Sequence, residues 1–131
     1  MDGSIRLVTV VLEVADLDRS LRLYRDGLGI DLHLTDHQGA EHGVGDRWIS
    51  GRHAATSWTT GAFLHFALYE SKGERTSGAQ LSFEVADIAA AHDAARSAGA
   101  EVLHDPRPEP WGTSARYRDF DGNVIELTQR V

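Results

Sequence analysis

The sequence predicts an α+β fold in which two βαβββ modules form one domain. The main observation is an internal repeat, since residues 8–29 read VTVVLEVADLDRSLRLYRDGLG and residues 79–99 read AQLSFEVADIAAAHDAARSAG. Each copy contains an alternating segment, the tripeptide Val-Ala-Asp and an amphipathic segment that ends in glycine. A repeat of this size indicates two similar units packed together. We therefore expect a single domain over 1–131, built of modules 5–70 and 79–131.

The first module is expected to begin with a strand over Leu7–Val14, where the two faces alternate in character. Asp16 suits the N-cap of the following helix, because its carboxylate accepts backbone N–H bonds. Gly27 or Gly29 is expected to end that helix. Its apolar residues recur at helical spacing: Leu17, Leu21, Tyr24 and Leu28. The rest of the module is expected as a strand on each side of the polar loop DHQGAEHGVGD within 30–50, a strand over 62–69 and a linker over 70–78.

The second module repeats this plan. An alternating strand over Gln80–Val85 leads to a helix that Asp87 caps and Gly99 ends. The dipeptide Asp121-Gly122 between two strand-like segments is a strong hairpin signal. The remaining elements are expected as a strand near Glu101–His104, a proline-rich turn DPRPEP, a strand near Thr113–Arg118 and a last strand over Asn123–Gln129.

Composition excludes several classes of function. The formal charge of −7 argues against a nucleic-acid partner, because nucleic acid selects basic patches. No apolar run reaches the ~18–20 residues of a membrane span, so no membrane partner is expected. Cysteine is absent, which excludes disulfides and thiolate metal sites. The first residues, MDGSIRL, lack the pattern of a secretory signal, and we expect a cytoplasmic protein.

Three motifs resemble a known superfamily. They are V-A-D-L-D-R-S-x(3)-Y-x(3)-L-G near the start, G-A-x-V in the middle and P-W-G-x(6)-D-x-D-G-N-x-I-E-L near the end. Together they resemble the vicinal oxygen chelate superfamily of glyoxalase I, bleomycin-resistance-type proteins, fosfomycin-resistance enzymes and extradiol dioxygenases. The resemblance implies that the two modules form a curved, open sheet around a cleft, with the helices on the outer face. It also implies that a ligand or metal binds in the cleft, often in a homodimer.

The repeat indicates which residues line this cleft. The helices are expected to cover the more apolar strand faces, which leaves Thr9 and Gln80 on the cleft side, each five residues before its Val-Ala-Asp. Aligning Gly61 with Gly122 makes His65 and Glu126 equivalent, each four residues after its glycine. The resemblance implies that metal ligands come from four such strand positions. The candidate quartet is Thr9, His65, Gln80 and Glu126.

This quartet is a poor set of metal ligands. First-row divalent ions prefer imidazole and carboxylate, which His65 and Glu126 supply, whereas Gln80 is a weak donor and Thr9 a very poor one. The pattern favours no metal cofactor. The alternative is a divalent ion (Zn, Ni, Mn or Fe) held by His65, Gln80 and Glu126. The other histidines show no ligand spacing and are expected to be solvated: His33, His37, His42, His53, His92 and His104.

Aromatic residues near the cleft suit a planar ligand. Trp111 lies in a Pro-Trp-Gly turn at the expected rim of the cleft. Trp58 comes shortly before the strand expected over 62–69, and Phe63 lies in that strand on the same face as His65. Trp48 is expected in the core or at a subunit interface. Arg116 and Arg118 alternate with Tyr117, so one of them can bind an acidic group in the pocket. The expected ligand-binding residues are Thr9, Trp58, Phe63, His65, Gln80, Trp111, Arg116 and Glu126.

These residues leave two main hypotheses open. The favoured one is a metal-independent protein that sequesters an aromatic or antibiotic-like molecule and so confers resistance. The alternative is a metal-dependent lyase, isomerase or dioxygenase that uses His65, Gln80 and Glu126, with Glu126 moving a proton. A metal-free enzyme with Glu126 or His65 as base is a third, weaker possibility. A homodimer is expected, and the sequence leaves open whether the cleft forms within one chain or between two.

Overall fold

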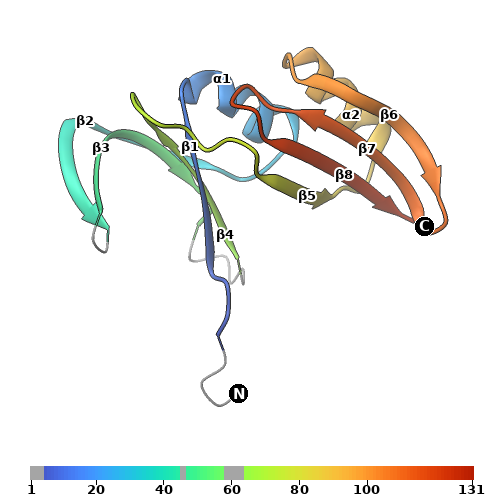
Figure 1. Ribbon diagram of the computed structural model, residues 1–131, viewed down its shortest axis with the longest axis horizontal. Coiled ribbons are helices and arrows are strands. Elements are labelled where there is room, and N and C mark those ends of the chain that lie inside the picture. Colours follow the sequence, from blue (N-terminus) through green and yellow to red (C-terminus); the bar gives the residue numbers. More distant parts are fainter. Residues whose placement is uncertain (1–4, 45–46, 58–63) are drawn as a thin grey trace.

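The computed structural model has two four-stranded sheets and two helical segments (Figure 1). It describes the backbone of residues 5–44, 47–57 and 64–131, and the side chains of 5–35, 52–57 and 64–131. Module one contains β1 (Thr9–Val14), α1 (Leu17–Leu21), its π-helical continuation η1 (Arg22–Gly27), β2 (His33–Val44), β3 (Arg47–Ala55) and β4 (His65–Glu70). Module two contains β5 (Gln80–Glu84), α2 (Ile88–Ser97), β6 (Glu101–Glu109), β7 (Gly112–Arg118) and β8 (Val124–Arg130). The βαβββ plan is therefore confirmed in both modules.

The two sheets share one topology. The strand order is β1-β4-β3-β2 in the first sheet and β5-β8-β7-β6 in the second. In each sheet the first and last strands of the module pair in parallel, and the other pairs are antiparallel. Each sheet is open and does not close into a barrel, as the superfamily resemblance predicted.

The helices begin where the sequence predicted. The Asp16 carboxylate accepts a hydrogen bond from the backbone N–H of Arg19, and the Asp87 carboxylate accepts one from Ala90, both at 3.1 Å. Each bond satisfies one of the N–H groups that a helix start leaves without a partner. Gly99 follows α2 with a φ of 99°, a conformation that only glycine adopts without strain. No helix in the described part of the chain is long and apolar enough to cross a membrane.

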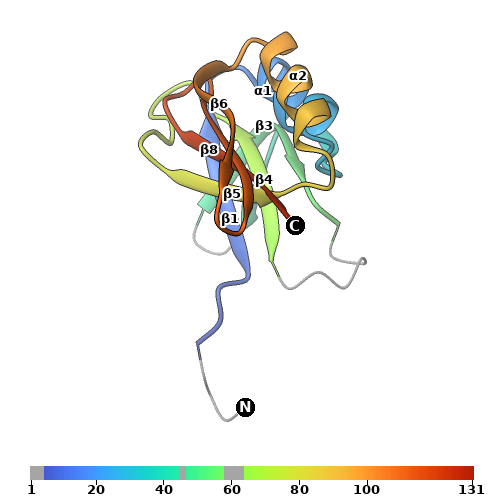
Figure 2. The same ribbon diagram turned by 90° about the vertical axis from the view of Figure 1, so that its right-hand side faces the viewer.

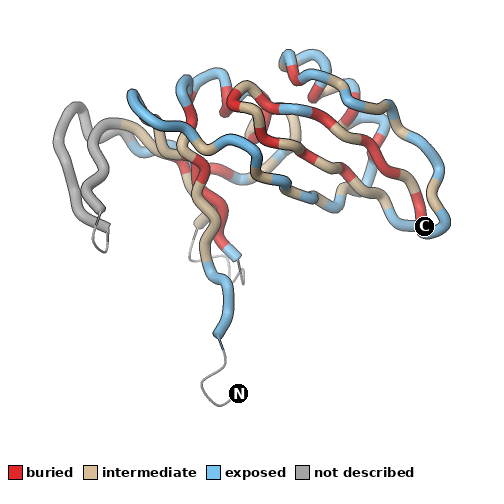
Figure 3. Tube along the Cα trace, in the orientation of Figure 1, coloured by how far each residue is buried: buried red, intermediate tan, exposed pale blue. Residues whose placement is uncertain are grey.

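Both helices lie on the same side of the molecule and contact each other through η1 and α2 (Figure 2). The strand residues that face them are buried, and buried positions alternate with more exposed ones along β7 and β8 (Figure 3). One apolar core therefore spans both modules. Its largest buried side chains include Leu12, Leu17, Leu21, Leu23, Tyr24, Leu68, Tyr117, Ile125 and Leu127.

The turn between β7 and β8 connects the two modules. The Tyr24 hydroxyl donates to the Asp119 carboxylate at 2.6 Å, and the Ala15 backbone N–H donates to Asp121 at 3.1 Å. The side-chain amide of Asn123 donates to the Thr76 carbonyl at 2.8 Å. The D-x-D-G-N motif of module two thus forms hydrogen bonds with three parts of module one and the linker: η1, the end of β1 and the segment around Thr76.

Two segments that were expected to be irregular are strands. The loop DHQGAEHGVGD lies largely within β2, whose pairing with β3 shifts register between Asp36 and Glu41. The proline-rich segment DPRPEP was expected as a turn, but β6 continues through it to Glu109. Proline is tolerated there because β6 is an edge strand and need not donate a hydrogen bond on its outer side. Register shifts on both sides of His104 accommodate the irregularity.

Candidate functional site

One face of the second sheet is not covered by a helix of the chain. α2 packs against β6, β7 and β8 on the core side, where Leu81, Phe83 and Ile125 point. The opposite face carries Gln80, Ser82 and Glu84 of β5, all exposed, as the alternation predicted. We call this surface the open face. The other strands contribute Val124, Glu126 and Thr128 of β8, and Ser114, Arg116 and Arg118 of β7. The β6 residues that pair with those of β7 are Arg107, His104 and Glu101.

The open face contains a hollow with a volume of about 470 Å³. Trp111 borders it with 42% of its surface exposed, and Glu126 of β8 also lines it, between its register partners Ser82 on β5 and Arg116 on β7. The lining residues are Ser82, Trp111, Glu126, Thr128 and Arg130. A large aromatic face beside a carboxylate and a hydroxyl suits a small molecule with both apolar and polar parts.

Glu126 has two polar neighbours at the centre of this face. The Ser82 hydroxyl donates to Glu126 Oε1 at 3.4 Å, and Arg116 Nε lies 3.8 Å from Glu126 Oε2. Three predicted binding residues, Trp111, Arg116 and Glu126, are therefore brought together by module two. Gln80 lies on the same face at the start of β5.

The module-one candidates lie elsewhere. Thr9 and His65 are register partners at the beginning of β1 and β4, the ends that project away from β5 and β8 (Figures 1 and 2). His65 is only 3% exposed, and its Nδ1 lies 3.3 Å from the Thr56 hydroxyl. Trp58 and Phe63 lie outside the described residues, as does the side chain of Trp48.

The strand register corrects the predicted equivalence of His65 and Glu126. Thr9 pairs with His65 in module one, whereas its counterpart Gln80 pairs with Val124 in module two. Glu126 pairs with Ser82, whose module-one counterpart Val11 pairs with Ala67. The glycine alignment was wrong because the first paired residue lies four positions after Gly61 but only two after Gly122.

The matched strand positions do not fit a resident metal ion. They are Thr9, Ala67, Gln80 and Glu126, of which the Glu126 carboxylate alone is a strong ligand for a divalent cation. Among the described residues, no group of three or more His, Asp or Glu side chains lies close enough to hold a metal. His65 stands at a different position along its strand from the one that Glu126 occupies.

Three of the histidines that were expected to be solvated are buried or partly buried in the structure: His53, His92 and His104. His92 is buried, and its Nδ1 lies 2.6 Å from the hydroxyl of Tyr117. Burial, together with the nearby charges of Asp105 and Asp93, raises the pKa of Tyr117 to about 12. His104 is partly buried and pairs with Arg116 across β6 and β7. This pairing does not follow from simple alternation along the sequence, because the register of β6 shifts on both sides of His104.

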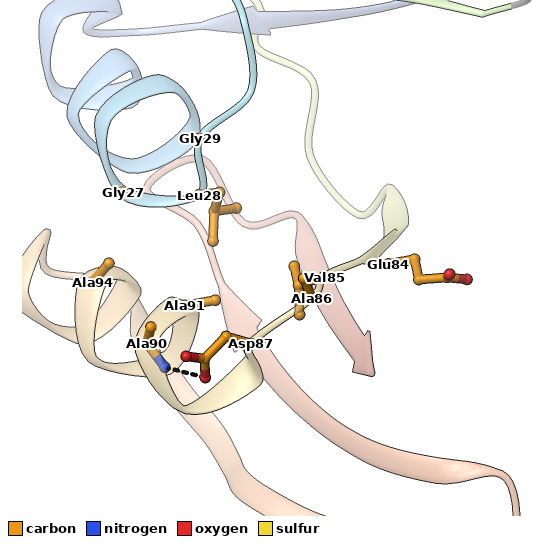
Figure 4. A pocket seen from close by; sticks show the side chains of 10 residues that line it. All are labelled: Gly27, Leu28, Gly29, Glu84, Val85, Ala86, Asp87, Ala90, Ala91 and Ala94. Atoms are coloured by element: carbon orange, nitrogen blue, oxygen red, sulfur yellow. Dashed lines mark hydrogen bonds between the residues drawn. The ribbon is translucent and has the colours of Figure 1, made fainter. Parts of the chain in front are cut away.

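A second groove lies on the helical side, between the end of η1 and the start of α2 (Figure 4). Its volume is about 520 Å³, and its walls are small residues of α2, mainly Ala90, Ala91 and Ala94. The Asp87 carboxylate at its edge is already used as the helix cap. The open face therefore offers the richer set of polar and aromatic groups.

The chain belongs to the Glyoxalase/Bleomycin resistance protein/Dioxygenase superfamily, whose family profile matches residues 6–127. It is 32% identical to a "Probable lactoylglutathione lyase" of Vibrio cholerae over 95% of this chain and 90% of that protein. A glyoxalase/bleomycin resistance protein from Streptomyces sp. CB03234 is 26% identical, with a TM-score of 0.63, over 94% of this chain and 99% of that one. The fold also matches TnmS3, described as an antibiotic binding protein from the same Streptomyces, with a TM-score of 0.67, 22% identity and full coverage of both chains.

Proposed function

We propose that this protein binds and sequesters a small aromatic or antibiotic-like molecule on its open face without a metal ion. The observation that carries the proposal is the strand register, which leaves Glu126 as the one strong metal ligand among the four matched positions. Beside Glu126 lies a hollow of about 470 Å³ with Trp111 at its edge. Stacking on an indole and burial of apolar area provide affinity without chelation.

The superfamily relationship is compatible with this role. The structural relative TnmS3 is described as an antibiotic binding protein, and its likeness to this chain concerns the fold. We extend the binding role to this chain because the open face combines an exposed tryptophan with a few polar groups. The ligand-contacting set proposed here is Trp111, Arg116, Glu126 and Gln80, with Thr9, His65, Trp58 and Phe63 contributed by module one. A cytoplasmic location stays a prediction from the sequence.

We further propose that the working unit is a homodimer. The hollow is lined by module-two residues. The described module-one candidates Thr9 and His65 lie at strand ends that project away from β5 and β8 (Figure 1). A second copy would bring its module one over this open face and close the cleft. The exposed apolar side chains of Ile5, Leu7 and Val8, just before β1, would then be covered.

Elemental analysis and a binding assay test the sequestration proposal. The purified protein is expected to contain less than stoichiometric Zn, Ni, Mn or Fe, even after incubation with each ion. A planar aromatic probe such as 2-naphthol is expected to bind equally well before and after treatment with a chelator. Trp111→Phe should keep that binding, measured by calorimetry, while it removes most of the quenching of tryptophan fluorescence.

The alternative function is a metal-dependent lyase. The 32% identity to a protein named as a probable lactoylglutathione lyase favours it. One tightly bound divalent ion per chain, together with an activity that chelation abolishes and the ion restores, would overturn the sequestration proposal. His65→Ala and Glu126→Ala should then each lower the metal content of the purified protein. Metal-independent binding predicts no such change.

A further inference from the structure

Four arginine–glutamate pairs lie on the open face, and in one of them the charged atoms are farther apart than in the other three. They are Arg118–Glu101 at 2.8 Å, Arg130–Glu84 at 2.8 Å, Arg107–Glu109 at 3.1 Å and Arg116–Glu126 at 3.8 Å. The three outer pairs have hydrogen-bond distances, whereas the central pair is beyond that range. The pair at the centre of the face is therefore the one with unused hydrogen-bonding capacity.

Arg116 has a donor without an acceptor. Its Nε–H is buried and makes no hydrogen bond among the described residues, although the side chain as a whole is 35% exposed. A buried donor left without a partner destabilises the folded state. Such a group is explained if a ligand supplies the missing acceptor.

His104 provides a complementary acceptor next to it. His104 and Arg116 are register partners in β6 and β7, so their side chains lie on the same face. His104 Nδ1 lies 2.9 Å from the Asp105 carbonyl oxygen, which can only accept, so Nδ1 carries the proton. In the neutral ring Nε2 is then an acceptor, and it is also buried without a partner among the described residues.

We propose that Arg116 and His104 form a subsite for a hydroxyl group of the bound molecule, such as a phenol. The inference rests on the proposed binding function and adds the chemistry of the ligand. A hydroxyl accepts from Arg116 Nε–H and donates to His104 Nε2, which satisfies both groups at once. The sequence suggested that Arg116 binds an acidic group, but a carboxylate fits this subsite less well than a hydroxyl does. Glu126 already lies 3.8 Å from the arginine, and a carboxylate anion has no proton to donate to His104.

Three probes with the same ring system test the subsite: naphthalene, 2-naphthol and 2-naphthoate. We expect 2-naphthol to bind the wild-type protein about tenfold more tightly than naphthalene, the gain from two modest hydrogen bonds. We expect 2-naphthoate to bind more weakly than 2-naphthol. In NMR spectra 2-naphthol, but not naphthalene, should shift the Arg116 Nε–H and His104 Nε2 resonances, while both should shift the Trp111 indole N–H.

Variants separate the hydroxyl contact from the aromatic contact. Arg116→Met and His104→Leu should each abolish the tenfold preference for 2-naphthol over naphthalene. Arg118→Met is the matched control, because Arg118 lies on the same face and strand but is already bonded to Glu101. Its preference for 2-naphthol should equal that of the wild type. If either test variant fails to fold, the wild-type NMR shifts still decide.

The outcomes distinguish this inference from the proposed function. If naphthalene and 2-naphthol bind equally and both shift Trp111, the open face binds aromatic molecules but the hydroxyl subsite is wrong. If 2-naphthoate binds most tightly, Arg116 serves an anion and the subsite is again wrong. If no probe shifts Trp111 at millimolar concentration, the aromatic-binding function fails together with the subsite.

Discussion

At the scale of single residues, Tyr24 joins the two modules. Its ring lies 5.5 Å from the ring of Phe66 in module one and 6.5 Å from that of Phe83 in module two. Its hydroxyl donates to Asp119 at 2.6 Å. Burial, followed by the charge of Asp119, raises the pKa of Tyr24 far above its ordinary value. The phenol therefore remains a hydrogen-bond donor at every pH at which the protein is handled.

Tyr24→Phe is expected to lower the free energy of unfolding by about 2 kcal/mol. The ring contacts remain, but the buried Asp119 carboxylate loses a charge-assisted hydrogen bond. Urea denaturation measures the change. The control is Asp26→Asn, which removes the negative charge of a surface ion pair with Arg25 on the same helical segment. This variant should change the free energy of unfolding by less than about 0.5 kcal/mol. Equal stability of the two variants would contradict the role given to Tyr24.

Alkaline pH is expected to destabilise the protein through Tyr117. Its pKa is raised to about 12 by burial and by Asp105 and Asp93, against about 10 in an unfolded chain. The folded state therefore holds this proton more tightly. The resulting stability is complete below pH 10 and is lost as the pH rises through 12. Denaturation at pH 8 to 11.5 should show a declining free energy of unfolding, and Tyr117→Phe should make the decline shallower. Parallel curves would disprove the assignment.

Some residues of the proposed site could be named from the sequence, and one could not, for a physical reason. Trp111 was expected in the site from its Pro-Trp-Gly turn, Arg116 from the alternation around Tyr117, and Glu126 from the superfamily resemblance. His104 was expected to be solvated because the histidines show no ligand spacing, whereas in the structure a register shift in β6 pairs it with Arg116. Cross-strand neighbours of this kind are set by tertiary pairing, which a single sequence does not encode locally.

At the scale of elements, the caps and the hairpin turn followed from local chemistry. Asp16, Asp87 and Asp121-Gly122 act where predicted, because capping and tight turns depend on a few adjacent residues. The extent of β2 and β6 was underestimated, since glycines and prolines disfavour strands in isolation. Pairing with β3 and β7 overrides that preference.

Gly112 at the start of β7 is expected to be essential for the close approach of β8. A Cβ atom at this position would collide with the carbonyl oxygen of Gln129. Gly112→Ala should therefore lower the free energy of unfolding by about 1–3 kcal/mol, the usual cost of overpacking. Gly73→Ala is the control, because a Cβ there would meet nothing within 4 Å. Thermal unfolding of both variants measures the difference, and similar midpoints would show that β8 can move aside.

At the scale of the whole molecule, the duplicated scaffold carries two unequal halves. The β5–β8 sheet carries Glu126, Arg116 and Trp111 on its open face. In module one, the residue at the position that corresponds to Glu126 is Ala67. An active site built symmetrically from both halves would need strong ligands in each. The inequality favours a cleft in which one module supplies the polar contacts and the other closes over the ligand.

The last prediction concerns which chains build this cleft. Since the chain has no cysteine, Thr9→Cys and Gln80→Cys give single reactive thiols on matched positions of the two modules. A 1:1 mixture of the two variants, treated with a short bis-maleimide reagent, should yield a species of twice the 14.4 kDa chain mass, and each variant alone should yield much less. In a homodimer with shared clefts these residues come from different chains. If the double variant cross-links within one chain and stays at 14.4 kDa, the cleft forms inside a single chain.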